Sequence, residues 1–99
     1  MAVFAIISEG PAAPQLRTAI ESKYPTGFRH WSDRVSFVVA SGPAQTVSDT
    51  LGIKTRLPDG RVSDGLPDVI VTQLGPTYWG WTGSDFWAWL ADAHLSQGG

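Results

Sequence analysis

The run Ala2-Val-Phe-Ala-Ile-Ile7 decides the fold of this 99-residue chain. Six apolar residues, three of them β-branched and followed by Ser8-Glu-Gly-Pro11, are typical of a strand rather than of a longer core helix. Because side chains alternate across a strand, apolar groups would point from both of its faces. We therefore expect a central strand that is covered on both sides.

Outward from this strand, apolar periodicity and the Pro and Gly residues divide the chain into further elements. They are predicted helices at residues 11–23 and 44–51, and predicted strands at residues 28–31, 34–40 and 68–74. The order strand, helix, strand, strand, helix, strand is the ferredoxin-like α+β pattern, an antiparallel sheet with both helices on one face. We expect a single domain.

Residues 53–66 lack a sustained period. Pro58-Asp-Gly60 within them predicts a turn, so the segment is either a small hairpin or a long loop. Gly52, directly before the segment, is a natural stop for the second helix.

A C-terminal extension, residues 75–99, follows the predicted core at residues 2–74. It predicts a short edge strand at residues 78–81 and a helix at about 85–95, and we expect it or a second subunit to cover the open face of the sheet. Base stacking usually comes with positive charge, and the aromatic part of this extension carries only Asp85 and Asp92 as charged residues. Its aromatic residues are therefore interpreted as core or as an interface for a protein partner, with the interface candidates Tyr78, Trp79, Trp81, Trp87 and Trp89.

The composition points in the same direction. Hydrophobic residues make up 42% of the chain and charged residues only 16%, with five Trp, so apolar surface is expected to be buried in a homodimer. The net charge of −2 and the lack of a Lys or Arg run leave nucleic-acid binding undecided. The absence of Cys excludes disulfides and thiolate metal sites. No segment has the length of a membrane helix or of a signal sequence, so we expect a cytoplasmic protein with no membrane contact.

Four polar residues are candidates for chemistry: Glu9, His30, Asp33 and Asp68. A carboxylate at the end of the first strand can act as a base, and a His–Asp pair can act as a general base or bind a metal. Glu9, Asp64 and Asp68 would suit Mg²⁺ if they converge. The alternative interpretation is solvated loop acids and a packed histidine, and the chain has no P-loop, GxSxG, HExxH or GxGxxG motif.

The layout of residues 2–74 resembles that of small Cas2-like and VapD-like proteins. The resemblance rests on the strand Val3–Ile7, the hairpin Trp31–Val39, the second helix and the strand Val69–Leu74. It implies a ferredoxin-like dimer and, for several members, a metal-dependent nuclease with an Asp at the end of the first strand. This chain has Ser8-Glu9 at that place, so Glu9 is the only acidic substitute.

Three functions remain open at this point. The first is a dimer-forming binding or accessory module without a catalytic site and without a cofactor. The second is a Mg²⁺-dependent nuclease of toxin type, and the third is a small-ligand sensor that binds between subunits. The fold alone does not choose among them, nor does it decide whether the protein is an enzyme, because this architecture hosts many functions.

Overall fold

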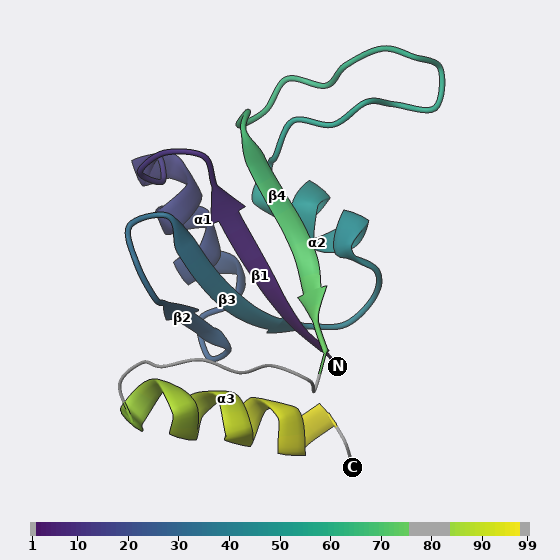
Figure 1. Cartoon of the computed structure of the whole chain (residues 1–99). Coiled ribbons are helices and arrows are strands. Elements are labelled where there is room, and N and C mark those ends of the chain that lie inside the picture. The colour runs from purple at the N-terminus through teal and green to yellow at the C-terminus, as the bar shows by residue number, and fades with distance from the viewer. Residues whose placement is uncertain (1, 76–83, 98–99) are drawn as a thin grey trace.

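The computed structural model describes residues 2–75 and 84–97 (Figure 1). The elements are β1 (Ala2–Ser8), α1 (Pro14–Lys23), β2 (Phe28–His30), β3 (Val35–Ala40), α2 (Ala44–Leu51), β4 (Val69–Leu74) and α3 (Ser84–Gln97). The order β-α-β-β-α-β predicted for the core is confirmed, and α3 follows it. The predicted edge strand at residues 78–81 lies outside the described residues.

The four strands form one antiparallel sheet in the order β2-β3-β1-β4. β1 is central, as its apolar sequence predicts, and it pairs with β3 on one side and β4 on the other. The register places Val3 between Val39 and Leu74, and Ile7 between Val35 and Ile70. Opposed residues point to the same face, so each register position defines a row of side chains across the sheet.

β1 separates two apolar clusters, because its alternate side chains enter different layers. Phe4 and Ile6 point into the inner cluster, where Leu16 and Ile20 of α1 and Val47 and Leu51 of α2 cover the sheet. Val3 and Ala5 point into the outer cluster, which also contains Phe37, Phe86, Leu90 and Ala93. Phe4, Val3 and Val47 are fully buried.

Local sequence explains the ends of the two inner helices. Pro14 opens α1, where its fixed φ suits the first turn and its missing N–H is not needed. Gly52 ends α2 in the left-handed conformation, with φ 74°, as predicted. None of the helices that the structure describes is long and apolar enough to cross a membrane.

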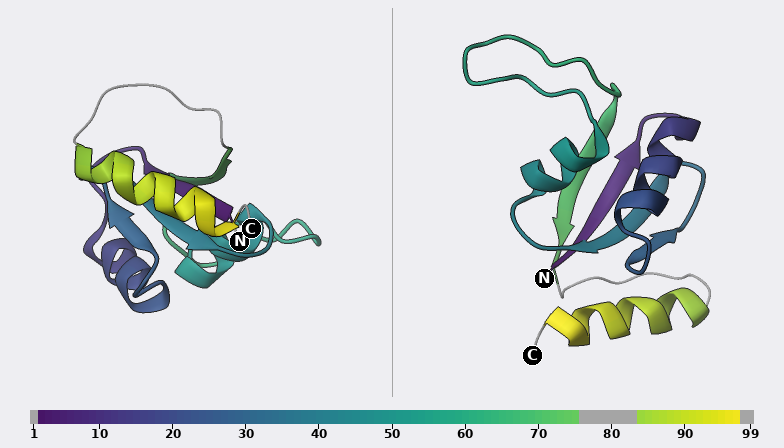
Figure 2. Two further views of the ribbon diagram at one scale, coloured as in Figure 1. Left: turned by 90° about the horizontal axis from the view of Figure 1, so that it is seen from below. Right: turned by 180° about the vertical axis from the view of Figure 1, so that it is seen from behind.

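The helix of the C-terminal extension, α3, covers the outer face of the sheet, so the chain itself supplies the cover that the sequence predicts. Phe86, Leu90 and Ala93 are its buried residues, and they contact Val3 and Ala5 of β1 within the outer cluster. Fourteen residues of helix span about 21 Å. α3 runs across the end of the sheet where β1 begins, and the other end of the outer face extends beyond it (Figures 1 and 2).

Residues 53–66 form an arm that projects from the sheet between α2 and β4 (Figure 1). The predicted turn is present: the Gly60 N–H donates to the Leu57 carbonyl, and the Leu57 N–H donates to the Arg61 carbonyl. Arg56 and Val62 form an antiparallel bridge behind this turn. Of the two predicted alternatives, the small hairpin is therefore the observed one.

Gly65 closes the base of this arm at a close approach between two backbone segments. The Leu66 N–H donates to the Gly52 carbonyl and the Lys54 N–H to the Leu66 carbonyl, which draws Gly65 against the chain after α2. A Cβ atom at Gly65 would lie 2.7 Å from the Gly52 carbonyl oxygen and 2.7 Å from the Lys54 nitrogen. Both neighbours are backbone atoms, so they cannot move away by a rotamer change.

We expect Gly65→Ala to destabilise the protein by about 2 kcal/mol, because it forces apart packed backbone. For a domain of this size that change lowers the Tm by about 10 °C, which thermal unfolding followed by circular dichroism will measure. Gly10→Ala is the matched control, because a Cβ atom there has no neighbour within 4 Å. Equal Tm values for the two variants would contradict the close approach.

Candidate functional site

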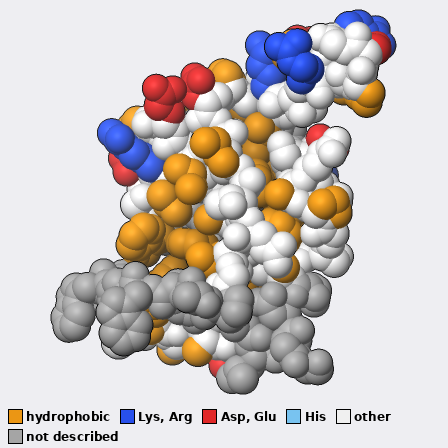
Figure 3. Space-filling model, turned by 45° about the vertical axis from the view of Figure 1, so that its right-hand side comes forward, with side chains coloured by type: hydrophobic (Ala, Val, Ile, Leu, Met, Phe, Trp, Pro, Cys, Tyr) orange, Lys and Arg blue, Asp and Glu red, His pale blue; other side chains and the backbone are white. Residues whose placement is uncertain are grey.

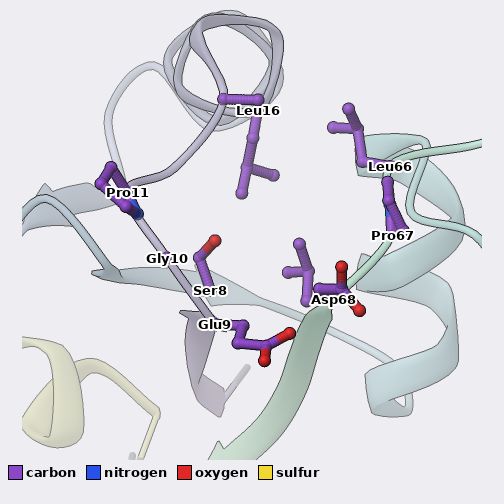
Figure 4. A pocket seen from close by; sticks show the side chains of 10 residues that line it. Ser8, Glu9, Gly10, Pro11, Leu16, Leu66, Pro67 and Asp68 are labelled. Carbon is purple, nitrogen blue, oxygen red and sulfur yellow. The ribbon is translucent and has the colours of Figure 1, made fainter.

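Glu9 and Asp68, two of the predicted candidates, lie together where β1 ends and β4 begins. The Glu9 N–H donates to the Asp68 carbonyl at 3.0 Å, which extends the β1–β4 ladder by one pair. Both side chains are exposed and line a hollow of about 420 Å³, which Leu16 of α1 and Leu66 of the arm also border. Figure 4 shows the Glu9 carboxylate directed toward Asp68.

Asp68 has an unusual backbone conformation at this position. Its φ is 61°, and among the described residues it is the only non-glycine residue with a positive φ. This left-handed conformation is uncommon outside glycine, although Asp tolerates it better than most residues. Pro67 precedes it, so the chain turns sharply into β4 and presents the carboxylate at the rim of the hollow (Figure 4).

Asp33 lies at the same end of the sheet, but it does not line the hollow. Its carbonyl accepts a hydrogen bond of 2.7 Å from the Ala12 N–H, so the β2–β3 turn contacts the loop before α1. The turn itself is held by Ser32, whose hydroxyl oxygen accepts hydrogen bonds from the N–H groups of Arg34 and Val35.

His30 is separated from the two carboxylates and joins three elements instead. Its Nε2 lies 2.9 Å from Oε2 of Glu21 on α1, and its Nδ1 lies 2.6 Å from Oγ of Ser36 on β3. A carboxylate only accepts, so Nε2–H donates to Glu21, and in the neutral ring Nδ1 accepts from the Ser36 hydroxyl. Ser36 is 3% exposed. The histidine therefore ties α1 to the sheet, in agreement with the packed alternative.

The four predicted residues thus reduce to one pair, Glu9 and Asp68. Within residues 2–75 and 84–93, whose side chains the structure describes, no group of three or more His, Asp or Glu could hold a metal ion. Two carboxylates suffice for Mg²⁺ only where waters or substrate phosphates complete its coordination.

A second feature, which the sequence analysis did not identify, is a row of apolar side chains on the outer face at the margin of the area that α3 covers. Ile70, Ile7 and Val35 are cross-strand neighbours, and the exposed fraction is 64% for Ile70 and 38% for Ile7. Trp31, which is 49% exposed, adjoins this row through the Phe37 ring at 6.2 Å. Hydrophobic side chains gather in the middle of the face that Figure 3 shows. We call Ile7, Val35, Ile70 and Trp31 the outer apolar row.

The sequence could not distinguish this row from buried positions. Every side chain in residues 2–7 is apolar, so the pattern predicts burial along the whole strand. It does not show that the helix covering the outer face ends before Ile7. In β4 the alternation is equally uninformative, because Val69 and Val71 on the inner face are as apolar as Ile70 on the outer face.

Of the predicted interface residues, Trp87 and Trp89 are half-buried against the outer cluster. Phe86 stacks on Trp89 at a centroid distance of 6.2 Å and on Trp31 at 5.9 Å. Part of the surface of Trp87 and Trp89 is thus buried within the outer cluster of the chain itself. Tyr78, Trp79 and Trp81 lie outside the described residues, so their role as interface residues stays a prediction.

An exposed ion pair links the start of α3 to the sheet. Arg29 of β2 donates to Oδ2 of Asp85 in the first turn of α3. The hydrogen bond and the positive charge of Arg29 lower the pKa of Asp85 below its usual value of 3.8. The position near the helix N-terminus also favours a negative charge.

We expect Asp85→Asn to destabilise the protein at neutral pH and to have little effect in acid. A carboxyl whose pKa is lower in the folded than in the unfolded chain stabilises the fold above its usual pKa of 3.8. That contribution is lost as the pH falls through the lowered value, so the Tm difference between wild type and Asp85→Asn should vanish there. Thermal unfolding across this range is the measurement.

Asp64→Asn is the control, because Asp64 is an exposed carboxylate on the arm next to β4, whereas Arg29 lies on β2 at the opposite edge of the sheet. It should give a Tm close to that of the wild type at neutral pH. A Tm difference for Asp85→Asn that persisted in strong acid would show that the ion pair is not its source.

A scan against protein-family models, a search of curated proteins and a search of solved structures each found no match to this chain. Because one architecture hosts many unrelated functions, the function has to come from the described residues themselves.

Proposed function

We propose that this protein is a dimer-forming binding or accessory module built on a ferredoxin-like fold. The observation that carries this proposal is the outer apolar row, in which Ile7 and Ile70 lie beyond the cover that α3 provides and Trp31 stays half-exposed beside it. The fold assignment is supported by the order β-α-β-β-α-β, the strand order β2-β3-β1-β4 and the placement of α1 and α2 on one face.

The row matters because its members are contiguous. Single exposed apolar side chains are normal on monomeric proteins, whereas a continuous patch marks an interaction site. Ile70, Ile7 and Val35 occupy one register position on three adjacent strands, so their side chains form an unbroken band. Ile70, with 64% of its surface in water, would gain most from a partner.

The surroundings of the row also fit an interface. Glu9, Arg34 and Asp68 are exposed at the same end of the sheet, where β1 ends and where β3 and β4 begin. An apolar centre with a polar margin is the usual anatomy of a protein–protein contact. Both signs of charge occur in this margin, so two copies of the chain need not repel each other.

We expect the wild-type protein to be a dimer at micromolar concentration, with twice the 10.6 kDa mass of the chain by light scattering. The variant Ile70→Thr should raise the dimer dissociation constant about fivefold, since it removes roughly 1 kcal/mol of apolar burial. Sedimentation equilibrium of both proteins is the measurement.

Val62→Thr is the control, because Val62 is 48% exposed and lies on the arm rather than on the sheet. It should dimerise like the wild type. A wild-type protein that stays monomeric up to submillimolar concentration would refute the dimer.

The pairing of Glu9 with Asp68 favours one second candidate, a Mg²⁺-dependent nuclease. Two carboxylates at the rim of a hollow can hold a cation, and a substrate phosphate can then complete the coordination of that cation. The resemblance to Cas2-like and VapD-like proteins, which the searches neither support nor contradict, points to the same chemistry. The absence of a third acidic ligand among the described residues makes this candidate the weaker one.

If the nuclease proposal is correct, Glu9→Gln and Asp68→Asn should each abolish cleavage of RNA or DNA in the presence of Mg²⁺ or Mn²⁺. The expected loss is at least about 100-fold, because each removes a charge that would hold the metal. Asp64→Asn, on the arm and outside the hollow, should retain activity. Wild-type protein that cleaves neither substrate with either metal would eliminate the nuclease.

A further inference from the structure

The two edges of the sheet differ in how well they are protected. β2, at one edge, has only three residues, and two of them carry ion pairs: Arg29 with Asp85 and His30 with Glu21. β4, at the other edge, has six residues and reads VIVTQL, without a charge, a proline or a glycine. Short and charged edges resist pairing with other chains, whereas long uncharged edges invite it.

The hydrogen-bonding groups on the open side of β4 can be assigned from the ladder. The Glu9 N–H donates to the Asp68 carbonyl, so Asp68 and every second residue after it direct their backbone groups toward β1. The N–H and C=O groups of Val69, Val71 and Gln73 therefore point away from β1. No strand in residues 2–75 pairs with β4 on that side.

We propose that two copies of this chain pair along β4, antiparallel, with Val71 on the two-fold axis. This inference rests on the proposed dimer and names its seam. In this register Val71 faces Val71 of the partner subunit, and Val69 faces Gln73 of the partner subunit. All three outward-facing residues then lie in hydrogen-bonded pairs, which makes six backbone bonds and joins the two sheets into one of eight strands.

The inner side of the edge has room for such a partner. Val71 borders a hollow of about 340 Å³ whose other walls are Ala44, Gln45 and Ser48 of α2 and residues Thr55 and Arg56 of the arm. The α2 side chains at this hollow are small or uncharged. The charged residue at this hollow is Arg56, whose guanidinium donates to the Gly60 carbonyl of its own arm at 3.4 Å, and the two α2 helices bring no opposed like charges to the axis.

The outer side connects the seam with the outer apolar row. A two-fold axis perpendicular to the sheet keeps both outer faces on the same side of the dimer. Ile70 then lies opposite Thr72 of the partner subunit, which covers part of an isoleucine that is 64% exposed in the single chain. Ile7 on β1 and Val35 on β3 lie one and two strands away from the seam, so this pairing covers Ile70 directly and joins the rest of the two rows into one apolar surface.

A second copy fits this edge better than an unrelated strand, because the edge is compatible with itself. The six paired residues carry no charge, so neither their register nor their direction creates repulsion. The nearest acid, Asp68, lies at the end of the strand, so the two-fold axis places the two Asp68 residues at opposite ends of the seam.

The register can be tested by cysteine cross-linking, because the chain contains no Cys. In a hydrogen-bonded antiparallel pair the Cα atoms are about 5.5 Å apart, which is within the range of a disulfide. We expect Val71→Cys, on mild oxidation, to shift from 10.6 kDa to twice that mass on a denaturing gel. Val62→Cys, on the arm, is the control and should stay at the single-chain mass.

A second experiment does not depend on the half-buried Val71. Val69→Cys and Gln73→Cys chains should each resist cross-linking alone, because equivalent residues are about 13 Å apart along the seam. Mixed and oxidised together, they should give a cross-linked heterodimer. Wild-type and reduced variant proteins are compared by thermal unfolding to verify that each is folded.

The outcomes separate the two proposals. A wild-type dimer in which neither Val71→Cys nor the mixed pair cross-links would overturn the β4 seam and leave the dimer itself standing. A wild-type monomer without cross-links would overturn both the dimer and its seam. A strand of another protein would then be the remaining partner for the β4 edge. Cross-linking of Val69→Cys alone, without the mixed product, would show a different register and also overturn the proposal.

Discussion

The structure depends on the burial of β1 from both sides. Its alternate side chains enter two different apolar clusters, with Phe4 and Ile6 in one and Val3 and Ala5 in the other. A strand of this kind is stable only when both faces are covered, so a two-layer sandwich of one sheet and two helices is not enough. The chain meets this requirement with α3, which supplies a third layer over part of the outer face.

The partial cover explains where the exposed apolar surface lies. α3 reaches Val3 and Ala5 but not Ile7, two residues further along the same face of β1. Its docking is set at one end by the Arg29–Asp85 ion pair and along its length by Phe86, Leu90 and Ala93. A helix held in this way cannot also protect Ile70, so the outer apolar row follows from the position of α3.

The Glu9–Asp68 pair and the outer apolar row lie at the same end of the sheet, but they suit different kinds of ligand. The Glu9–Asp68 pair offers negative charge but has no third ligand among the described residues. It could therefore bind a cation only weakly, or only when a substrate supplies further ligands. The apolar row and the β4 edge, which no strand of the described residues pairs with on its outer side, offer surface and backbone hydrogen bonds, which are the requirements of a protein contact. For a chain with few charges, the second use agrees better with its composition.

The sequence by itself determined the core elements, because their signals are local. The apolar run of β1, Pro14 at the start of α1 and Gly52 at the end of α2 act within a few residues of themselves, and the structure confirms each. Only the tertiary structure decided which polar residues meet: the ladder pairs Glu9 with Asp68, whereas His30 turns to Glu21 and Ser36 on the other side of the sheet. It also decided that Ile7 and Ile70 are exposed, because exposure depends on how far α3 extends across the face, and no residue of β1 or β4 encodes that length.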